Sequence, residues 1–191
     1  MDSLFAIKGK GFVLVAFESS VIHSIQKLKN QEDKSYVLDD KTLLAVAGEA
    51  ADRDNFSSFI QRNVQFLKFK NNSSLLVRET AEFVRTKLAE FIRKSPFQAN
   101  TFVAGFDSVE GAQLYWLDYL GTLAEVNHGG HGYASYFVSS ILANFWRPDL
   151  TEAQALDITS HCINELRTRF IVDQANFTIK IIDEKGIRII Q

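Results

Sequence analysis

Residues 4–17, Leu-Phe-Ala-Ile-Lys-Gly-Lys-Gly-Phe-Val-Leu-Val-Ala-Phe, contain the pattern that decides the fold. Two apolar runs, 4–8 and 12–17, flank a turn that contains two glycines, and this arrangement predicts an antiparallel β-hairpin. An antiparallel strand usually alternates apolar and polar residues because one face meets water, yet 12–17 is apolar throughout. These strands therefore need cover on both faces. The first strand starts so early that we expect no leader segment before it.

Later segments supply more strands and the helices that cover them. The runs 43–47 and 102–106 repeat the all-apolar pattern. Apolar residues at a spacing of about 3.6 predict helices over 49–69 and 74–94. The segment 132–146 is apolar on nearly all sides, so we expect a third helix there that lies between other layers.

A fourth helix has a clear start signal. Thr151 and Gln154 match a Thr-x-x-Gln capping box, which predicts a helix over 152–169. Turn sequences rich in acidic residues and glycine predict two more hairpins, which pair 99–106 with 112–118 and 176–182 with 187–190.

The order of these elements favours one architecture. Neither a simple β-sandwich nor an alternating parallel α/β fold gives hairpins, two helices, hairpins, two helices and a hairpin. Two stacked antiparallel sheets, each with a helix pair on its outer face, bury both faces of every strand. We therefore predict an α+β fold, a four-layer α-β-β-α sandwich, as a single domain over residues 1–191.

Composition restricts the partners and the compartment. The 191 residues carry a formal charge of -2, and no block of Lys and Arg is long enough to follow a phosphate backbone, so we expect no nucleic-acid partner. No apolar run approaches the ~20 residues of a membrane span, so we expect no membrane partner. A single cysteine, Cys162, suits a reducing compartment, and we expect the chain in the cytoplasm and nucleus.

The histidines and Cys162 do not form a convincing metal site. His128 and His131 lie in a glycine-rich turn, and His161 with Cys162 follows one helix later without a complete ligand set. We predict that His131 packs or caps at a helix start and that Cys162 is a small core residue. The turn at 129–132 lacks the Lys-Ser/Thr ending of a phosphate loop. We therefore expect neither a metal nor a cofactor.

Residues 43–56, Leu-Leu-Ala-Val-Ala-Gly-Glu-Ala-Ala-Asp-Arg-Asp-Asn-Phe, resemble the strand-to-helix signature of proteasome subunits. The similarity continues through 118–122, 131–133 and 147–151 and covers essentially the whole chain. Among these subunits the chain is most similar to the fourth-position β subunit of eukaryotes, the beta type-2 class. The resemblance implies the N-terminal-nucleophile hydrolase fold, which is this four-layer sandwich. It also implies three sets of partners: other β subunits in a heptameric ring, the opposing β ring and the α ring.

The resemblance also assigns the positions of a catalytic site. Active β subunits attack the peptide carbonyl with the hydroxyl of an N-terminal threonine, and its α-amino group acts as the base. A lysine, an aspartate and a glycine N–H support this reaction. In this chain Asp2 falls on the nucleophile, Glu18 on the aspartate, Lys34 on the lysine and Gly48 on the oxyanion glycine. His131 replaces a serine, Asp173 matches a second aspartate, and Asn176 replaces a second serine.

The residue at the nucleophile position, Asp2, decides whether the resemblance implies a catalytic subunit. Its carboxylate has no hydroxyl to deprotonate, and we expect Met1 to block its amine. The resemblance thus implies a non-catalytic structural subunit of the 20S core, acting in ubiquitin-dependent degradation through the complex. Lys34 with Glu18 is then a semi-buried ion pair, and Gly48 serves a tight turn. The alternative is an active hydrolase that uses Ser3, which requires cleavage after Asp2, whereas processing in this family follows a glycine.

Several aromatic side chains have no obvious partner in the sequence, and assembly into a ring would give them one. Because obligate interfaces are large and apolar, we expect neighbouring subunits to bury some of Phe66, Phe69, Phe97, Tyr119 and Trp146. The loop 19–33 is long for a strand connection, and we expect it to contact a neighbouring ring.

Overall fold

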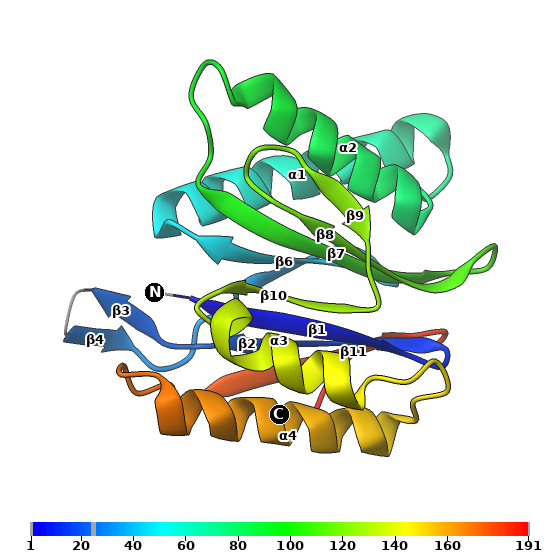
Figure 1. Cartoon of the computed structure of the whole chain (residues 1–191). Helices are drawn as coiled ribbons and strands as arrows, with labels where there is room; N and C mark the ends of the chain where they lie inside the picture. Colours follow the sequence, from blue (N-terminus) through cyan, green and yellow to red (C-terminus); the bar gives the residue numbers. More distant parts are fainter. Residues whose placement is uncertain (1, 24–25, 191) are drawn as a thin grey trace.

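Two five-stranded antiparallel sheets stack on each other in the computed structural model, which describes residues 2–23 and 26–190. A helix pair covers the outer face of each sheet (Figure 1). The predicted four-layer α-β-β-α sandwich is therefore confirmed. The first sheet contains, in spatial order, β10 (His128–Gly132), β1 (Ser3–Gly9), β2 (Phe12–Glu18), β11 (Phe177–Asp183) and β12 (Gly186–Ile189).

The second sheet has the same number of strands and its own helix pair. In spatial order it contains β5 (Ser35–Asp39), β6 (Thr42–Gly48), β7 (Ala99–Asp107), β8 (Gly111–Leu117) and β9 (Leu123–Glu125). The helices α1 (Ala50–Asn71) and α2 (Val77–Phe91) cover this sheet, and α3 (Ala134–Phe145) and α4 (Glu152–Arg169) cover the first sheet (Figure 1).

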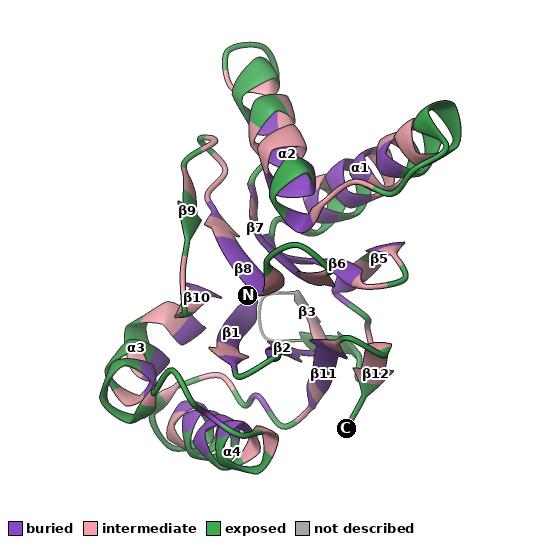
Figure 2. Cartoon of the chain, turned by 90° about the vertical axis from the view of Figure 1, so that its right-hand side faces the viewer, coloured by how far each residue is buried: buried purple, intermediate pink, exposed green. Residues whose placement is uncertain are grey.

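Strand β2 shows why the apolar run at 12–17 does not alternate. Phe12, Leu14 and Ala16 pack into the core beneath α3 and α4. The residues between them, such as Val15 and Phe17, face the second sheet and pack into the core between the sheets. Both faces are buried (Figure 2). An apolar residue at every position is what two-sided burial requires.

The ends of two helices follow from local hydrogen bonds. The Thr151 side chain accepts from the Gln154 backbone N–H, and the Gln154 side chain accepts from the Thr151 N–H, so the predicted capping box at α4 is confirmed. Glu49 is the N-cap of α1, where its carboxylate accepts from the backbone N–H groups of Ala51 and Asp52. This cap fixes the direction of the chain immediately after β6.

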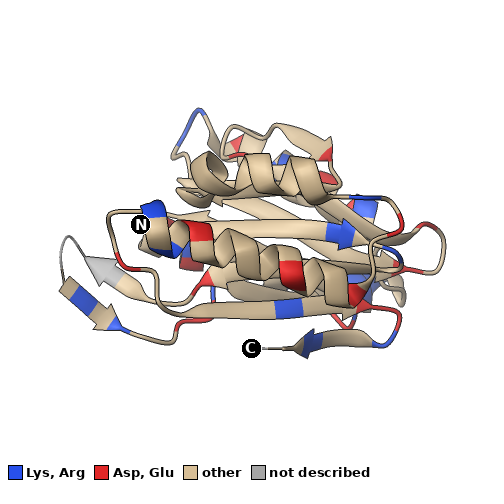
Figure 3. Cartoon of the chain, turned by 60° about the horizontal axis from the view of Figure 1, so that its bottom comes forward, with Lys and Arg blue, Asp and Glu red and all other residues tan. Residues whose placement is uncertain are grey.

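Helix α3 corrects one prediction. It does not lie between layers but on the outside of the sandwich, where only Ala134, Val138 and Leu142 are buried. Tyr136 is 82% exposed and Phe145 is 53% exposed. No Lys, Arg, Asp or Glu occurs in α3, as the uninterrupted tan helix in Figure 3 shows. The apolar character of this helix therefore exceeds what the chain itself can bury.

Short strands replace two segments that the sequence suggested were irregular. The glycine-rich segment at 129–132 is not a turn but part of the edge strand β10, which pairs antiparallel with β1. The segment 19–33 is not a plain loop, since it contains the paired strands β3 (Val21–His23) and β4 (Gln26–Lys29). Strand β10 consists of glycine and histidine, and β3 and β4 are only three and four residues long, so no long apolar run predicts them.

The expected interface aromatics divide into two groups. Phe66 and Phe69 on α1 are 62% and 83% exposed. Phe97 instead packs within the chain, with its ring 5.2 Å from that of Phe56, and the Trp146 indole N–H donates to the Lys8 carbonyl at 2.8 Å. Phe97 and Trp146 thus have partners inside the chain, and burial of some of these side chains by neighbouring subunits stays a prediction. Tyr119 is half-buried.

Over the described part of the chain, none of the helices is both long enough and apolar enough for a membrane crossing.

Two phenylalanines of α1 provide a matched test of this core. Phe56 is fully buried and Phe69 is 83% exposed, so replacement by alanine changes helix propensity equally at both positions. We expect Phe56→Ala to lower the free energy of unfolding by about 3–5 kcal/mol. Phe69→Ala should change it by less than about 0.5 kcal/mol. Urea unfolding of the purified chain measures both, and equal losses would contradict this packing.

Candidate functional site

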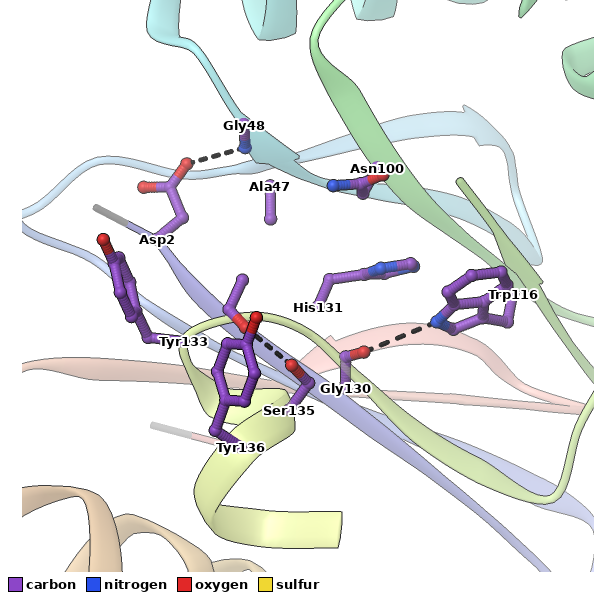
Figure 4. A pocket seen from close by; sticks show the side chains of 11 residues that line it. Asp2, Ala47, Gly48, Asn100, Trp116, Gly130, His131, Tyr133, Ser135 and Tyr136 are labelled. Carbon is purple, nitrogen blue, oxygen red and sulfur yellow. Dashed lines mark hydrogen bonds between the residues drawn. The ribbon is translucent and has the colours of Figure 1, made fainter. Parts of the chain in front are cut away.

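The N-terminal end of β1 meets the end of β6 at one edge of the sandwich, beside a cavity. This cavity has a volume of about 600 Å³ (Figure 4). Its lining residues come from both sheets and from the start of α3: Asp2, Ala47, Gly48, Asn100, Trp116, Gly130, His131, Gly132, Tyr133, Ser135 and Tyr136. The cavity therefore contains three of the positions singled out from the sequence, namely Asp2, Gly48 and His131.

The Asp2 carboxylate is held through both of its oxygens. Lys34 donates from Nζ to Oδ1 at 2.7 Å, and the Gly48 backbone N–H donates to Oδ2 at 3.0 Å. A guanidinium N–H of Arg53 also donates to Oδ2, at 3.3 Å. The side chain at the nucleophile position is thus fixed by two cations and one amide. We expected Met1 to block the amine of Asp2, but Met1 lies outside the described residues.

Lys34 joins Asp2 to a second buried carboxylate. Its Nζ also donates to Glu18 Oε2 at 3.3 Å and to the Ser20 carbonyl at 3.0 Å. The Lys34 and Glu18 side chains are 2% and 0% exposed, so the ion pair is fully buried and not semi-buried as expected. Within the group around Asp2 the buried charges balance, because Lys34 and Arg53 oppose Asp2 and Glu18.

Electrostatics keep Asp2 ionised. Burial by itself raises the pKa of this carboxyl group. The charge and hydrogen bond of Lys34, the Gly48 N–H and the charge of Arg53 outweigh burial and hold the pKa of Asp2 below its ordinary value of 3.8. Asp2 is therefore a carboxylate at neutral pH.

Two glycines allow the backbone to close around Asp2. Gly48 has a φ of +155°, and a Cβ at this position would lie 1.9 Å from the Gln98 carbonyl oxygen. Gly132 has a φ of +64°, and its Cβ would lie 2.0 Å from the Asp2 carbonyl oxygen. No other residue fits at either position without moving the backbone. This contact with Gln98 gives the physical reason for the small residue that the sequence suggested at Gly48.

His131 forms part of the cavity wall and is 3% exposed. Its Nε2 is 2.9 Å from the Thr101 carbonyl oxygen, and its ring stacks on Trp116 with centroids 4.9 Å apart. Burial lowers the pKa of His131 from 6.5 to about 4, although the Thr101 carbonyl and Asp118 raise it. A neutral imidazole here supports packing between β10 and the second sheet.

The remaining positions do not join this site. Asp173 is exposed, and Asn176 lines a different cavity together with Ser19, whose backbone N–H donates to the Asn176 carbonyl at 2.8 Å. Ser3 is fully buried, and it lies on the face of β1 that Phe5 also uses, toward α3 and α4. Asp2 points to the opposite face, so the Ser3 hydroxyl does not face Lys34.

Arg53 is the main residue that the sequence did not predict. It lies in the first turn and a half of α1, and its side chain is 5% exposed. Its Nε also donates to Asp54 at 3.2 Å, and the Tyr36 hydroxyl donates to the same Asp54 oxygen at 2.8 Å. Arg53 is the single basic residue within 43–56, and this was the available signal for its role. Because Asp52 and Asp54 flank it, the segment is also typical of a solvent-exposed helix start.

Metal and thiol chemistry receive no support from the described residues. Across 2–23 and 26–190, no group of three or more His, Cys, Asp or Glu side chains is placed to hold a metal ion. Cys162 is buried, and burial raises the pKa of its thiol to about 12. It packs in the core beneath α3 and α4, as the sequence predicted.

Comparison with known proteins decides the family. The family described as "Proteasome subunit" matches residues 2–182 of the chain. The chain belongs to the proteasome subunit family. It is 42% identical to proteasome subunit beta type-2-A of Arabidopsis thaliana over 188 residues, which cover 98% of this chain and 92% of that protein.

Two other relatives show the same full-length similarity. The chain is 40% identical to proteasome subunit beta type-2 of Dictyostelium discoideum over 193 residues, covering 100% of this chain and 97% of that protein. It is 36% identical to proteasome subunit beta type-4 of Saccharomyces cerevisiae over 190 residues, covering 98% and 96%. The predicted resemblance to proteasome β-type subunits is confirmed.

The buried ion pair gives a direct stability test. Lys34→Met removes the cation shared by Asp2 and Glu18 and leaves two buried carboxylates with one remaining counter-charge. We expect a loss of about 3–5 kcal/mol in the free energy of unfolding. Lys29→Met is the matched control, since the Lys29 side chain is 59% exposed and pairs with Glu32 at the surface. Lys29→Met should lower the free energy of unfolding by less than about 1 kcal/mol. If Lys34→Met lowered it by no more than Lys29→Met does, the buried network would be contradicted.

His131 predicts a specific pH dependence. Its pKa in the folded chain lies below the ordinary 6.5, so the unfolded state binds the proton first as the pH falls. Stability from neutral His131 is complete above 6.5 and is lost between 6.5 and about 4, by about 3 kcal/mol in total. His131→Asn should make the dependence of the free energy of unfolding on pH shallower across that range, while the part due to His128, whose pKa burial also lowers, remains. The exposed His161→Asn should keep the full slope, and an unreduced slope in His131→Asn would refute the assignment.

Proposed function

We propose that this chain is a non-catalytic structural subunit of the 20S proteasome core and forms part of the β ring that encloses the proteolytic chamber. Full-length similarity to subunits named beta type-2 and beta type-4 supports this role. The single observation that carries it is the state of Asp2, whose carboxylate occupies the nucleophile position and is fixed by Lys34, Gly48 and Arg53.

This arrangement removes each part of the chemistry that active relatives are expected to use. A catalytic threonine needs a hydroxyl whose proton can be transferred to a base, whereas the Asp2 side chain is already an ionised carboxylate. The Gly48 N–H already donates to Asp2, so it is not free to stabilise a substrate oxyanion. Lys34 neutralises two carboxylates of its own chain. The site therefore stabilises structure.

The alternative of an active hydrolase that uses Ser3 has no supporting contact. The Ser3 side chain is fully buried between β1 and the helix layer, and its oxygen has no hydrogen-bond partner among the described residues. To face Lys34 it would have to rotate to the other face of β1, because adjacent strand residues point to opposite sides. Such a rotation would expose the core beneath α3 and α4.

Surface composition supports a role in assembly. Phe66 and Phe69 on α1 and Tyr136 on α3 are exposed in the chain by itself. Obligate interfaces bury large apolar areas. We propose as partners the neighbouring subunits of a heptameric β ring, the opposing β ring and the α ring. We place the subunit in the cytoplasm and nucleus, where the complex would degrade ubiquitin-marked proteins.

A covalent probe tests this function in the assembled particle. Peptide epoxyketones react with the hydroxyl and amine of an N-terminal threonine, so a core particle that contains this chain should be labelled only on other subunits. Labelling of those subunits in the same sample is the positive control. Peptide mapping of this chain should show no adduct. An adduct on a peptide that begins at Ser3 would overturn the non-catalytic assignment and establish the alternative.

A further inference from the structure

The residues around Asp2 form a binding site for one negative charge. Donors converge on its carboxylate from three separate segments: the loop before β5, the end of β6 and the first turns of α1. They comprise one ammonium, one backbone N–H and one guanidinium. This donor set resembles sites that bind free carboxylates, because it offers hydrogen bonds from charged donors and a backbone N–H to both oxygens.

A count of the buried charges shows that the site requires an anion. With Asp2 in place, Lys34 and Arg53 oppose Asp2 and Glu18, and these four charges sum to zero. Without the Asp2 carboxylate the same group carries one excess positive charge. Asp54 pairs with Arg53 at 3.2 Å, but its side chain is 53% exposed, so solvent screens this pair and it offsets only part of the excess charge, whereas the Lys34 and Arg53 side chains are 2% and 5% exposed. An uncompensated buried charge is costly.

The neighbouring cavity gives this site a route to solvent. Asp2 and Gly48 both line the cavity of about 600 Å³ (Figure 4). A small carboxylate that entered there could reach the Gly48 N–H without disturbing the core between the sheets. Formate has the same two-oxygen group as the Asp2 side chain and is small enough to replace it.

We propose that Asp2 is an internal ligand in an anion-binding site formed by Lys34, Gly48 and Arg53, and that a small carboxylate binds there when Asp2 is removed. The chain thus occupies its own site. This inference rests on the proposed function only in identifying Gly48 with the oxyanion position. Binding of the anion depends on charge and geometry alone.

Chemical rescue tests the proposal in the assembled core particle. The readout is hydrogen–deuterium exchange of the segment 46–53, measured in sodium formate and in sodium chloride at equal ionic strength. In chloride, Asp2→Gly should exchange faster than the wild type in this segment, because the Gly48 N–H loses its acceptor. Formate should slow this exchange toward the wild-type rate, since its oxygens replace those of Asp2.

A matched variant separates the buried site from general salt effects. Asp54→Gly also removes a carboxylate that contacts Arg53, but it leaves Asp2 in the site. Formate and chloride should therefore give equal exchange for Asp54→Gly and for the wild type. If formate and chloride also give equal exchange for Asp2→Gly, the anion-binding site is refuted.

A second variant carries the test if Asp2→Gly does not assemble. Asp2→Ala keeps the β-carbon and removes both carboxylate oxygens, so the Gly48 N–H again loses its acceptor. Its exchange over 46–53 in chloride should exceed that of the wild type and should slow toward the wild-type rate in formate, and equal exchange in the two salts would overturn the proposal. The two hypotheses fail separately: a probe adduct on this chain would refute the non-catalytic function, whereas absent rescue by formate would refute only the anion site.

Discussion

The buried ion pair between Asp2 and Lys34 is the interaction on which the site depends. It joins the start of β1 to the loop before β5, and the further contacts of Asp2 with Gly48 and Arg53 extend it to β6 and α1. Charges this deeply buried are tolerated only as a balanced set. In the proposed function, the same four-charge group that fixes the N-terminal segment also keeps Asp2, Lys34 and Gly48 from acting on a substrate.

The sandwich makes this arrangement possible because its strands are buried on both faces. Stacking of the two sheets brings the end of β6 next to the start of β1, although they are separated by about forty residues of sequence. Close approach of the backbones then requires glycine at 48 and 132. This approach presents the Asp2 carboxylate to Lys34 and to the Gly48 N–H at the same time.

The elements that bury apolar side chains were predictable from the sequence, because two-sided burial and capping leave clear patterns. The outer position of α3 and the edge strand β10 were not predictable in this way, because α3 is apolar although Tyr136 is exposed and β10 consists mainly of glycine. The assignment of Asp2, Lys34 and Gly48 to one site followed from the family resemblance. The role of Arg53 did not, because a long-range contact with the first residues of the chain leaves no local pattern.

In the proposed function the Asp2 carboxylate occupies the nucleophile position in the working particle. A high-resolution structure of the assembled core particle that contains this chain is the decisive measurement. We expect density for Asp2 with its two oxygens in hydrogen-bond contact with Lys34 and the Gly48 N–H. A chain that begins at Ser3, with the Ser3 hydroxyl turned toward Lys34, would contradict it.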